Sequence, residues 1–121
     1  MSRFATVEIH QNELSFSAGH FTIFSATERE DLHGHNYYVS AVFQVQIDDN
    51  GLAFDYRIYK NKLRALCAQL DQRFLLPAQS RFLTLEEKDG FLLAHFNTEK
   101  IPFLKRDVVV LPICNVTIEE L

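Results

Sequence analysis

Apolar and polar residues alternate along two long stretches in the N-terminal half of the chain, a pattern typical of half-buried β-strands. The first stretch covers residues 6–24 and alternates imperfectly. The second runs from His35 to Ile47 and has an apolar residue at every second position from Tyr37 onward. A turn sequence, Asp48-Asp49-Asn50-Gly51, follows it. We expect the two stretches to form a long antiparallel pair of strands.

The spacing of apolar residues changes to three and four from Asp55 onward, which predicts an amphipathic helix with Asp55 as its N-cap. Pro77 closes this segment. Basic and polar residues fill most of the remaining positions, so one face of the helix is expected to be solvated. The apolar positions are Ile58 or Tyr59, Leu63, Leu66, Cys67, Leu70 and Phe74.

Shorter β-patterns follow the helix. Residues 80–85 and 91–96 flank the polar residues 86–90 and predict a hairpin, in which His95 faces solvent or a neighbouring strand. Residues 108–111 form an apolar run that ends before Pro112, and residues 117–121 are typical of the start of a helix.

Composition limits the possible classes of protein. A chain of 121 residues with 47% hydrophobic residues can bury one core, so we expect a single domain over residues 1–121. The net charge of −4 argues against a nucleic-acid partner. Cys67 and Cys114 lack metal-like spacing, and we expect both to be free, buried thiols in a reducing compartment. Neither a signal peptide nor a membrane span is evident, so we expect a cytoplasmic protein without a membrane partner.

Three histidines are the candidate metal ligands. His33 and His35 are two residues apart at the start of the second strand, so both imidazoles project from one face. His20 lies in register with Phe16 and Ala18 on the first strand and adds a third imidazole if the strands pair. Three neutral histidines with one open position are the arrangement of a catalytic zinc site. A His-x-His pair alone is more often a pair of surface or hydrogen-bonded histidines, and the spacing leaves that reading open.

Two motifs carry a family resemblance. Phe16-Ser17-Ala18-Gly19-His20 and Leu32-His33-Gly34-His35-Asn36-Tyr37 resemble the zinc signature of the 6-pyruvoyl-tetrahydropterin synthase family, which includes the 6-carboxy-tetrahydropterin synthases of the queuosine pathway. The resemblance implies that His20, His33 and His35 hold Zn²⁺. It also implies an α+β tunnelling fold, in which a four-stranded antiparallel sheet carries one or two helices on one face. Such subunits form an oligomeric barrel, commonly a homohexamer of two stacked trimers.

The loop between the two motifs departs from the common family pattern. The usual catalytic cysteine is missing, because no cysteine lies between Phe21 and Leu32. Glu30, three residues before His33, resembles the glutamate that replaces the cysteine in a distinct subgroup of the family. That subgroup converts 7,8-dihydroneopterin triphosphate to 6-hydroxymethyl-7,8-dihydropterin, a folate precursor. The resemblance therefore implies a zinc-dependent pterin lyase with Glu30 as its catalytic base.

Two further departures concern the rest of the site. Gln72 stands where the family's Asp-His pair has histidine, which leaves Asp71 as the remaining catalytic or orienting group of that pair. The chain stops at Leu121, where the family continues through a helix and a last strand. If residues 117–121 begin that helix, Thr117 and Glu119 are the expected pterin-binding residues. If they are the last strand, Glu120 takes this role. We favour the helix.

The chemistry of a dihydropterin side chain supports cleavage. A base that removes the proton of the hydroxyl on the second side-chain carbon allows the bond to the first carbon to break. Removal of a carbon-bound proton leads instead to triphosphate elimination and a pyruvoyl product. A partly desolvated glutamate whose pKa is raised towards neutrality suits the first task, and a thiolate suits the second. The alternatives are a 6-pyruvoyl- or 6-carboxy-tetrahydropterin synthase-type activity, or a non-catalytic homologue that binds pterin or zinc.

Overall fold

The computed structural model describes residues 3–53 and 55–121, so Met1, Ser2 and Phe54 lie outside the described part. The chain forms two compact units. The first contains residues up to Phe16 together with 36–71, and the second contains residues 17–35 and 72–121. Two long strands, β1 (Arg3–His20) and β2 (His33–Ile47), contribute residues to both units.

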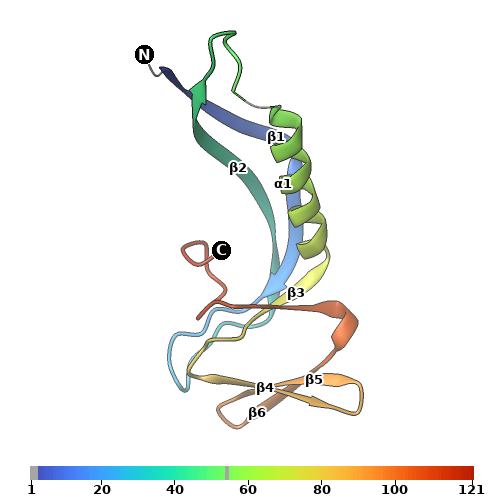
Figure 1. Ribbon diagram of the computed structural model, residues 1–121. Coiled ribbons are helices and arrows are strands. Elements are labelled where there is room, and N and C mark those ends of the chain that lie inside the picture. The colour runs from blue at the N-terminus through green and yellow to red at the C-terminus, as the bar shows by residue number, and fades with distance from the viewer. Residues whose placement is uncertain (1–2, 54) are drawn as a thin grey trace. The chain divides into compact units, whose positions relative to one another are not determined.

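In the first unit, helix α1 (Tyr56–Leu70) accompanies the paired strands β1 and β2, which run in opposite directions (Figure 1). The predicted N-cap is confirmed, because the Asp55 carboxylate accepts the backbone N–H of Arg57 at 3.0 Å. Glu13 of β1 forms ion pairs with Lys60 and Arg64 of the helix. On the other strand, the ring of Phe43 in β2 lies 5.2 Å from that of Tyr59 in the helix, so α1 contacts both strands.

The turn after β2 is also confirmed. The Asp48 carboxylate accepts the N–H groups of Asn50 and Leu52 at 2.8 and 2.9 Å. Gly51 has a φ of 78°, a left-handed conformation that glycine adopts without the steric cost of a Cβ. This turn ends the strand where the sequence pattern predicted it.

The predicted end of the helix is wrong. The pattern extended the apolar stripe to Phe74, whereas α1 ends at Leu70 and Phe74 belongs to strand β3 (Arg73–Pro77). Gln72 between them has a φ of 58°, which interrupts the right-handed helix. Phe74 lies four residues after Leu70, so helical spacing alone could not separate it from the stripe.

The four-stranded sheet has the order β2-β1-β3-β7, where β7 is Val108–Leu111. The predicted run over residues 108–111 is therefore confirmed as a strand. The sheet is mixed, contrary to the expected antiparallel arrangement, because β3 pairs in parallel with both β1 and β7. Parallel neighbours need long crossover connections. Residues 21–72 and 78–107 supply them, and alternation within each strand does not reveal strand direction.

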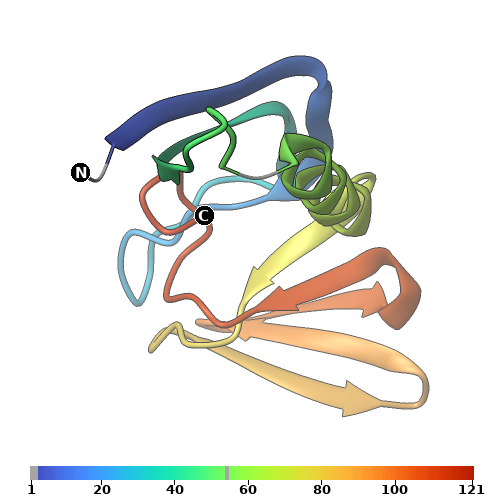
Figure 2. The ribbon, with the colours of Figure 1, turned by 45° about the horizontal axis from the view of Figure 1, so that its top comes forward.

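The second connection contains a three-stranded antiparallel sheet of β4 (Leu83–Lys88), β5 (Phe91–Phe96) and β6 (Glu99–Leu104), followed by a 3₁₀ turn at Lys105–Asp107 (Figure 2). The predicted hairpin is β4–β5, but residues 86–88, which were expected in its turn, belong to β4. The hairpin turns at Asp89 and Gly90, which have positive φ values of 53° and 84°. His95 contacts Glu86 across this hairpin at 2.7 Å, as expected for a residue that faces a neighbouring strand. Strand β6 was not predicted, because Pro102 obscures its β-pattern; proline is tolerated there because β6 is an edge strand.

The core of the second unit lies between the end of β1 and the three-stranded sheet. Its buried residues are Phe21, Ile23, Leu76, Leu83, Leu92, Ala94 and Phe96. Residues 21–23 therefore form a rigid base directly after His20, and the polar loop that follows starts from a packed segment.

The two cysteines differ in environment. Cys67 is buried as predicted, and desolvation raises the pKa of its thiol. Cys114 is exposed, so the expectation of a buried thiol there is wrong. It follows Ile113 in an irregular segment after β7, where an apolar neighbour in the sequence does not imply burial. No helix within the described residues is both long and apolar enough to cross a membrane.

Candidate metal centre and acidic loop

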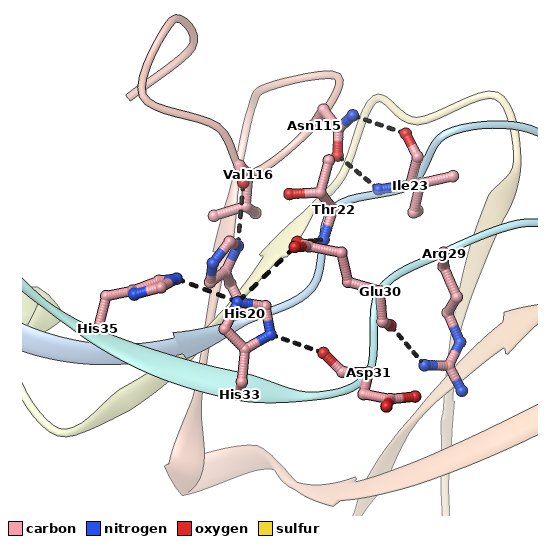
Figure 3. Close-up of polar contacts among 10 residues, drawn as sticks. All are labelled: His20, Thr22, Ile23, Arg29, Glu30, Asp31, His33, His35, Asn115 and Val116. Atoms are coloured by element: carbon pink, nitrogen blue, oxygen red, sulfur yellow. Dashed lines mark hydrogen bonds and ion pairs between the residues drawn. The ribbon is translucent and has the colours of Figure 1, made fainter.

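The second unit brings the three predicted histidines together (Figure 3). His20 is the last residue of β1, while His33 and His35 lie at the start of β2. Their ligand atoms all lie within 4.8 Å of one another, and the Nε2 atoms of His33 and His35 are 3.0 Å apart. The pairing of two strands thus converges three imidazoles that are up to fifteen residues apart in the chain.

Backbone carbonyls orient two of the three rings. His20 Nδ1 lies 3.1 Å from the Val116 carbonyl oxygen, and His33 Nδ1 lies 2.7 Å from that of Asp31. A carbonyl can only accept, so each Nδ1 carries the proton in these hydrogen bonds. In the neutral ring Nε2 then keeps its lone pair, which is the tautomer that a metal ligand needs.

His20 is the most buried of the three, with 6% of its surface exposed. Desolvation lowers the pKa of His20, and the neighbouring charge of His33 lowers it further. Both effects favour the neutral imidazole. This buried ring is therefore already in the protonation state that binds a metal.

The donor set fits zinc. Three neutral imidazoles are a known ligand set of catalytic zinc sites, with Zn–N distances of about 2.0–2.1 Å. Such distances separate tetrahedral ligand atoms by roughly 3.3 Å, close to the observed spacing of 3.0 Å between His33 and His35. The distances from His20 to the other two ligand atoms do not exceed 4.8 Å.

Asn115 holds the segment that orients His20, a role that the sequence analysis missed. Its Oδ1 accepts the Ile23 N–H at 3.1 Å, and its Nδ2 donates to the Ile23 carbonyl at 2.9 Å. The side-chain amide thus pairs with one residue's backbone as a neighbouring strand would. The next residue, Val116, supplies the carbonyl that orients His20. Asn115 lies in the segment Leu111-Pro112-Ile113-Cys114-Asn115, in which no spacing rule links the amide to Ile23.

Glu30 lies beside the histidines, and its catalytic role stays a prediction. Its Oε1 accepts the Thr22 N–H at 2.9 Å, and its backbone N–H donates to the Thr22 carbonyl at 2.9 Å. Its Oε2 is 3.9 Å from His33 Nε2. About a third of each of these two side chains is exposed, so a ligand can approach the gap between them.

The pKa of Glu30 was expected to be raised, but it is lowered. The Thr22 hydroxyl and N–H hydrogen-bond the carboxylate and lower the pKa of Glu30, and this effect exceeds the opposing effect of burial. The loop is too open for desolvation to dominate. Glu30 is consequently ionised at neutral pH, the protonation state required of a base, although its intrinsic basicity is lower than we expected.

Asp71 and Gln72 lie at the end of the helix. Asp71, in the first unit, is the C-cap of α1, and its backbone N–H donates to the Cys67 carbonyl at 2.9 Å. Gln72 is exposed, and its N–H donates to the Ser17 carbonyl. The observed contacts give Asp71 a capping role, and its catalytic role stays a prediction.

The C-terminal segment forms a turn. The Thr117 carbonyl accepts the N–H groups of Glu120 and Leu121 at 3.2 and 3.0 Å. These bonds span three and four residues, as in the first turn of a helix, so they favour the helical alignment over the strand. Thr117 is half-buried, while Glu119 and Glu120 are exposed. Their pterin-binding roles stay predictions.

Comparisons with known proteins define the class of protein. The family model described as 6-pyruvoyl tetrahydropterin synthase matches residues 8–121. The chain therefore belongs to the 6-pyruvoyl tetrahydropterin synthase family, as the two histidine motifs indicated.

Individual relatives agree with this assignment. A Methanocaldococcus jannaschii protein, provisionally named a 6-carboxy-5,6,7,8-tetrahydropterin synthase, is 28% identical over 109 residues, which cover 89% of this chain and 66% of that protein. The chain thus spans just under two thirds of the length of this curated relative.

Solved structures extend the match to the fold. A Plasmodium vivax 6-pyruvoyltetrahydropterin synthase, in a variant that replaces a catalytic glutamate with alanine, is 34% identical with a TM-score of 0.90 over 98% of this chain and 72% of that chain. The Plasmodium falciparum enzyme is 33% identical with a TM-score of 0.89, over 97% of this chain and 72% of that chain. The predicted α+β tunnelling fold is confirmed.

Proposed function

We propose that the protein is a zinc-dependent pterin lyase that converts 7,8-dihydroneopterin triphosphate to 6-hydroxymethyl-7,8-dihydropterin for folate synthesis. The observation that carries this proposal is the position of the Glu30 carboxylate, 3.9 Å from His33 Nε2 in the three-histidine cluster. The glutamate described as catalytic in the Plasmodium vivax relative supports a carboxylate in this role.

His20, His33 and His35 would hold the zinc. Bound zinc supplies Lewis acidity that lowers the pKa of the hydroxyl groups on the substrate side chain. The Val116 and Asp31 carbonyls keep two of the rings in the ligand tautomer and orientation. These two rings therefore need little reorganisation when the metal binds.

Glu30 would move the proton. Thr22 holds Oε1, which leaves Oε2 on the histidine side as the oxygen that accepts a proton from the substrate. Fixing one oxygen limits rotation of the carboxylate and keeps the other directed at the reacting group. The ionised state of Glu30 at neutral pH is the state that this step requires.

The proposed reaction is a retro-aldol cleavage. Oε2 of Glu30 takes the proton of the hydroxyl on the second side-chain carbon, and the C–O bond there becomes a carbonyl. The bond between the first and second carbons breaks, and its electron pair passes into the dihydropterin. The first carbon then takes up a proton to become the hydroxymethyl group. The second and third carbons leave as an aldehyde that carries the triphosphate, so no oxidant or reductant is needed.

The remaining predicted residues complete the proposal. Thr117 and Glu119 would bind the pterin ring, with Glu120 as the alternative to Glu119, and Asp71 would orient groups of the site. The turn at Thr117 follows directly after Val116, which contacts His20, and this continuity supports a role for the segment in the site.

We further propose that the chain assembles as a homohexamer of two stacked trimers. In the first unit, β2 exposes Tyr38 and Val42 by 72% and 64%, and α1 exposes Ile58 and Leu66 by 54% and 55%. Apolar side chains on a strand and a helix are expected to be covered in an assembly. Light scattering should give six times the chain mass of 14.0 kDa, and a mass of one chain at micromolar concentration would contradict the proposal.

Product analysis tests the proposed function. Zinc-loaded protein is incubated with 7,8-dihydroneopterin triphosphate, and the pterins are separated by chromatography. The proposal predicts 6-hydroxymethyl-7,8-dihydropterin. A Glu30→Cys variant should shift the ratio towards triphosphate loss and pyruvoyl or carboxy products, because a thiolate suits removal of a carbon-bound proton.

The curated relative favours a second candidate, a 6-carboxy-tetrahydropterin synthase-type activity. A carboxy product as the main product of the unaltered protein would support it over the lyase. No pterin product at all would favour a binding protein without catalytic activity.

A further inference from the structure

Arg29 makes an unusual set of contacts in the loop that carries Glu30. Its Nε and Nη2 donate to Glu99 Oε1 and Oε2 at 3.0 and 3.1 Å, and its Nη1 donates to the Glu30 carbonyl at 2.8 Å. Its guanidinium carbon lies 5.3 and 5.9 Å from the ring centres of Phe21 and Phe96. Only 15% of this side chain is exposed.

This environment differs from that of an ordinary surface ion pair. A single exposed pair contributes little, because solvent screens it and two flexible side chains must be ordered. Here the guanidinium binds a carboxylate through two parallel bonds and lies near two core rings, an arrangement that fixes its plane. Phe21 and Phe96 belong to the buried core of the second unit, so Arg29 is anchored to rigid structure.

The anchor acts on the backbone of Glu30. The Glu30 N–H donates to the Thr22 carbonyl, and the Glu30 carbonyl accepts from Arg29. Both polar groups of the Glu30 backbone are therefore held, which leaves only the side-chain torsions free. Thr22 N–H then holds one oxygen of the carboxylate itself. Figure 3 shows Arg29 and Thr22 on opposite sides of Glu30.

We propose that Arg29 is a positioning residue, which anchors the Glu30 backbone, and through it the Glu30 carboxylate, to the core rings Phe21 and Phe96 and to Glu99 of β6. It does not touch the substrate. Its effect on turnover rests on the proposed function of Glu30, whereas its effect on the carboxylate position does not. Turnover therefore tests the effect of Arg29 on catalysis, and hydrogen exchange of the Thr22 amide tests its effect on the carboxylate position.

The test compares Arg29→Ala and Arg29→Lys with a matched control, Lys105→Ala. Lys105 also pairs with a glutamate of the three-stranded sheet, Glu87 at 2.9 Å, but it lies in the 3₁₀ turn after β6 and not in the loop that carries Glu30. Two quantities are measured at equal zinc content: kcat and KM with 7,8-dihydroneopterin triphosphate, and the hydrogen-exchange rate of the Thr22 amide.

We expect Arg29→Ala to lower kcat by about 10- to 100-fold with a much smaller change in KM, since small displacements of a reacting group cost this much. Exchange of the Thr22 amide should accelerate by about tenfold, because its acceptor is the Glu30 carboxylate. Arg29→Lys should fall between wild type and Arg29→Ala, since a lysine has no planar fork to bind both partners. Lys105→Ala should change neither quantity.

Thr22 exchange and kcat in Arg29→Ala equal to those in Lys105→Ala would overturn the proposal. If Arg29→Ala does not fold, Arg29→Lys and Glu99→Gln decide it by the same two measurements. Faster Thr22 exchange in Arg29→Ala would support the positioning role. If Glu30→Gln at the same time kept wild-type turnover, Glu30 would not be the base. Unchanged Thr22 exchange in Arg29→Ala, together with a large loss of turnover in Glu30→Gln, would support Glu30 as the base and refute the positioning role of Arg29.

Discussion

Asn115→Ala should weaken zinc binding from a distance, and this prediction follows from two hydrogen bonds. The amide side chain holds the Ile23 N–H and carbonyl at 3.1 and 2.9 Å, and the following residue, Val116, accepts from His20 Nδ1. Alanine removes both bonds and releases the Val116 carbonyl from its fixed position. The tautomer and orientation of His20 then lose their support.

The magnitude can be worked from these contacts. Each lost hydrogen bond costs about 0.5–1.5 kcal/mol, so the free energy of unfolding of the metal-free protein should fall by about 1–3 kcal/mol. Loss of a group that orients a metal-bound histidine typically lowers metal affinity by about 10- to 100-fold. The substitution should therefore affect both stability and zinc affinity.

The matched control is Cys114→Ala, a neighbouring substitution at an exposed side chain. Zinc affinity is measured by competition with a chelator, and unfolding by urea at one fixed protein concentration without metal. A zinc affinity of Asn115→Ala within twofold of the control, with a reduced free energy of unfolding, would refute the coupling through Val116 and His20.

Three further substitutions or conditions test the site and its packing. His33→Ala should lose bound zinc, and full zinc stoichiometry in this variant would show that the site is assigned wrongly. Gly19→Ala should lower the free energy of unfolding by about 1–3 kcal/mol, because the new Cβ would lie 2.6 Å from the Phe74 ring and force it to move; an unchanged urea midpoint would contradict this close packing. The metal-free protein should lose stability as pH falls from the ordinary histidine pKa of about 6.5 through the lowered pKa of His20, because the unfolded state then binds a proton that the folded state disfavours. His20→Asn should remove this part of the pH dependence, and identical pH profiles of urea unfolding would contradict it.

Local patterns predicted much of the structure. The two-residue spacing of His33 and His35 placed both rings on one face of a strand, and the structure brings His20 to them. The Asp55 cap and the β4–β5 hairpin depend on neighbouring residues, which is why sequence reasoning found them.

Long-range contacts could not be predicted in the same way. Arg29 and Glu99 are separated by β2, α1, β3 and the β4–β5 hairpin, and no spacing rule links them. The pairing of Asn115 with the Ile23 backbone depends on a crossover that sequence alternation does not encode. The direction in which the pKa of Glu30 shifts depends on Thr22. Its hydrogen bonds to the carboxylate lower the pKa by more than burial raises it.

Turnover of Glu30→Gln tests the central claim most directly. Glutamine keeps the shape of the side chain and an oxygen for the Thr22 N–H, but it cannot act as the base. With 7,8-dihydroneopterin triphosphate and equal zinc content, its turnover should be about 10²–10⁴-fold below that of the wild type. Glu28→Gln, in the same loop, should cost little. Equal turnover of Glu30→Gln and wild type would contradict the account.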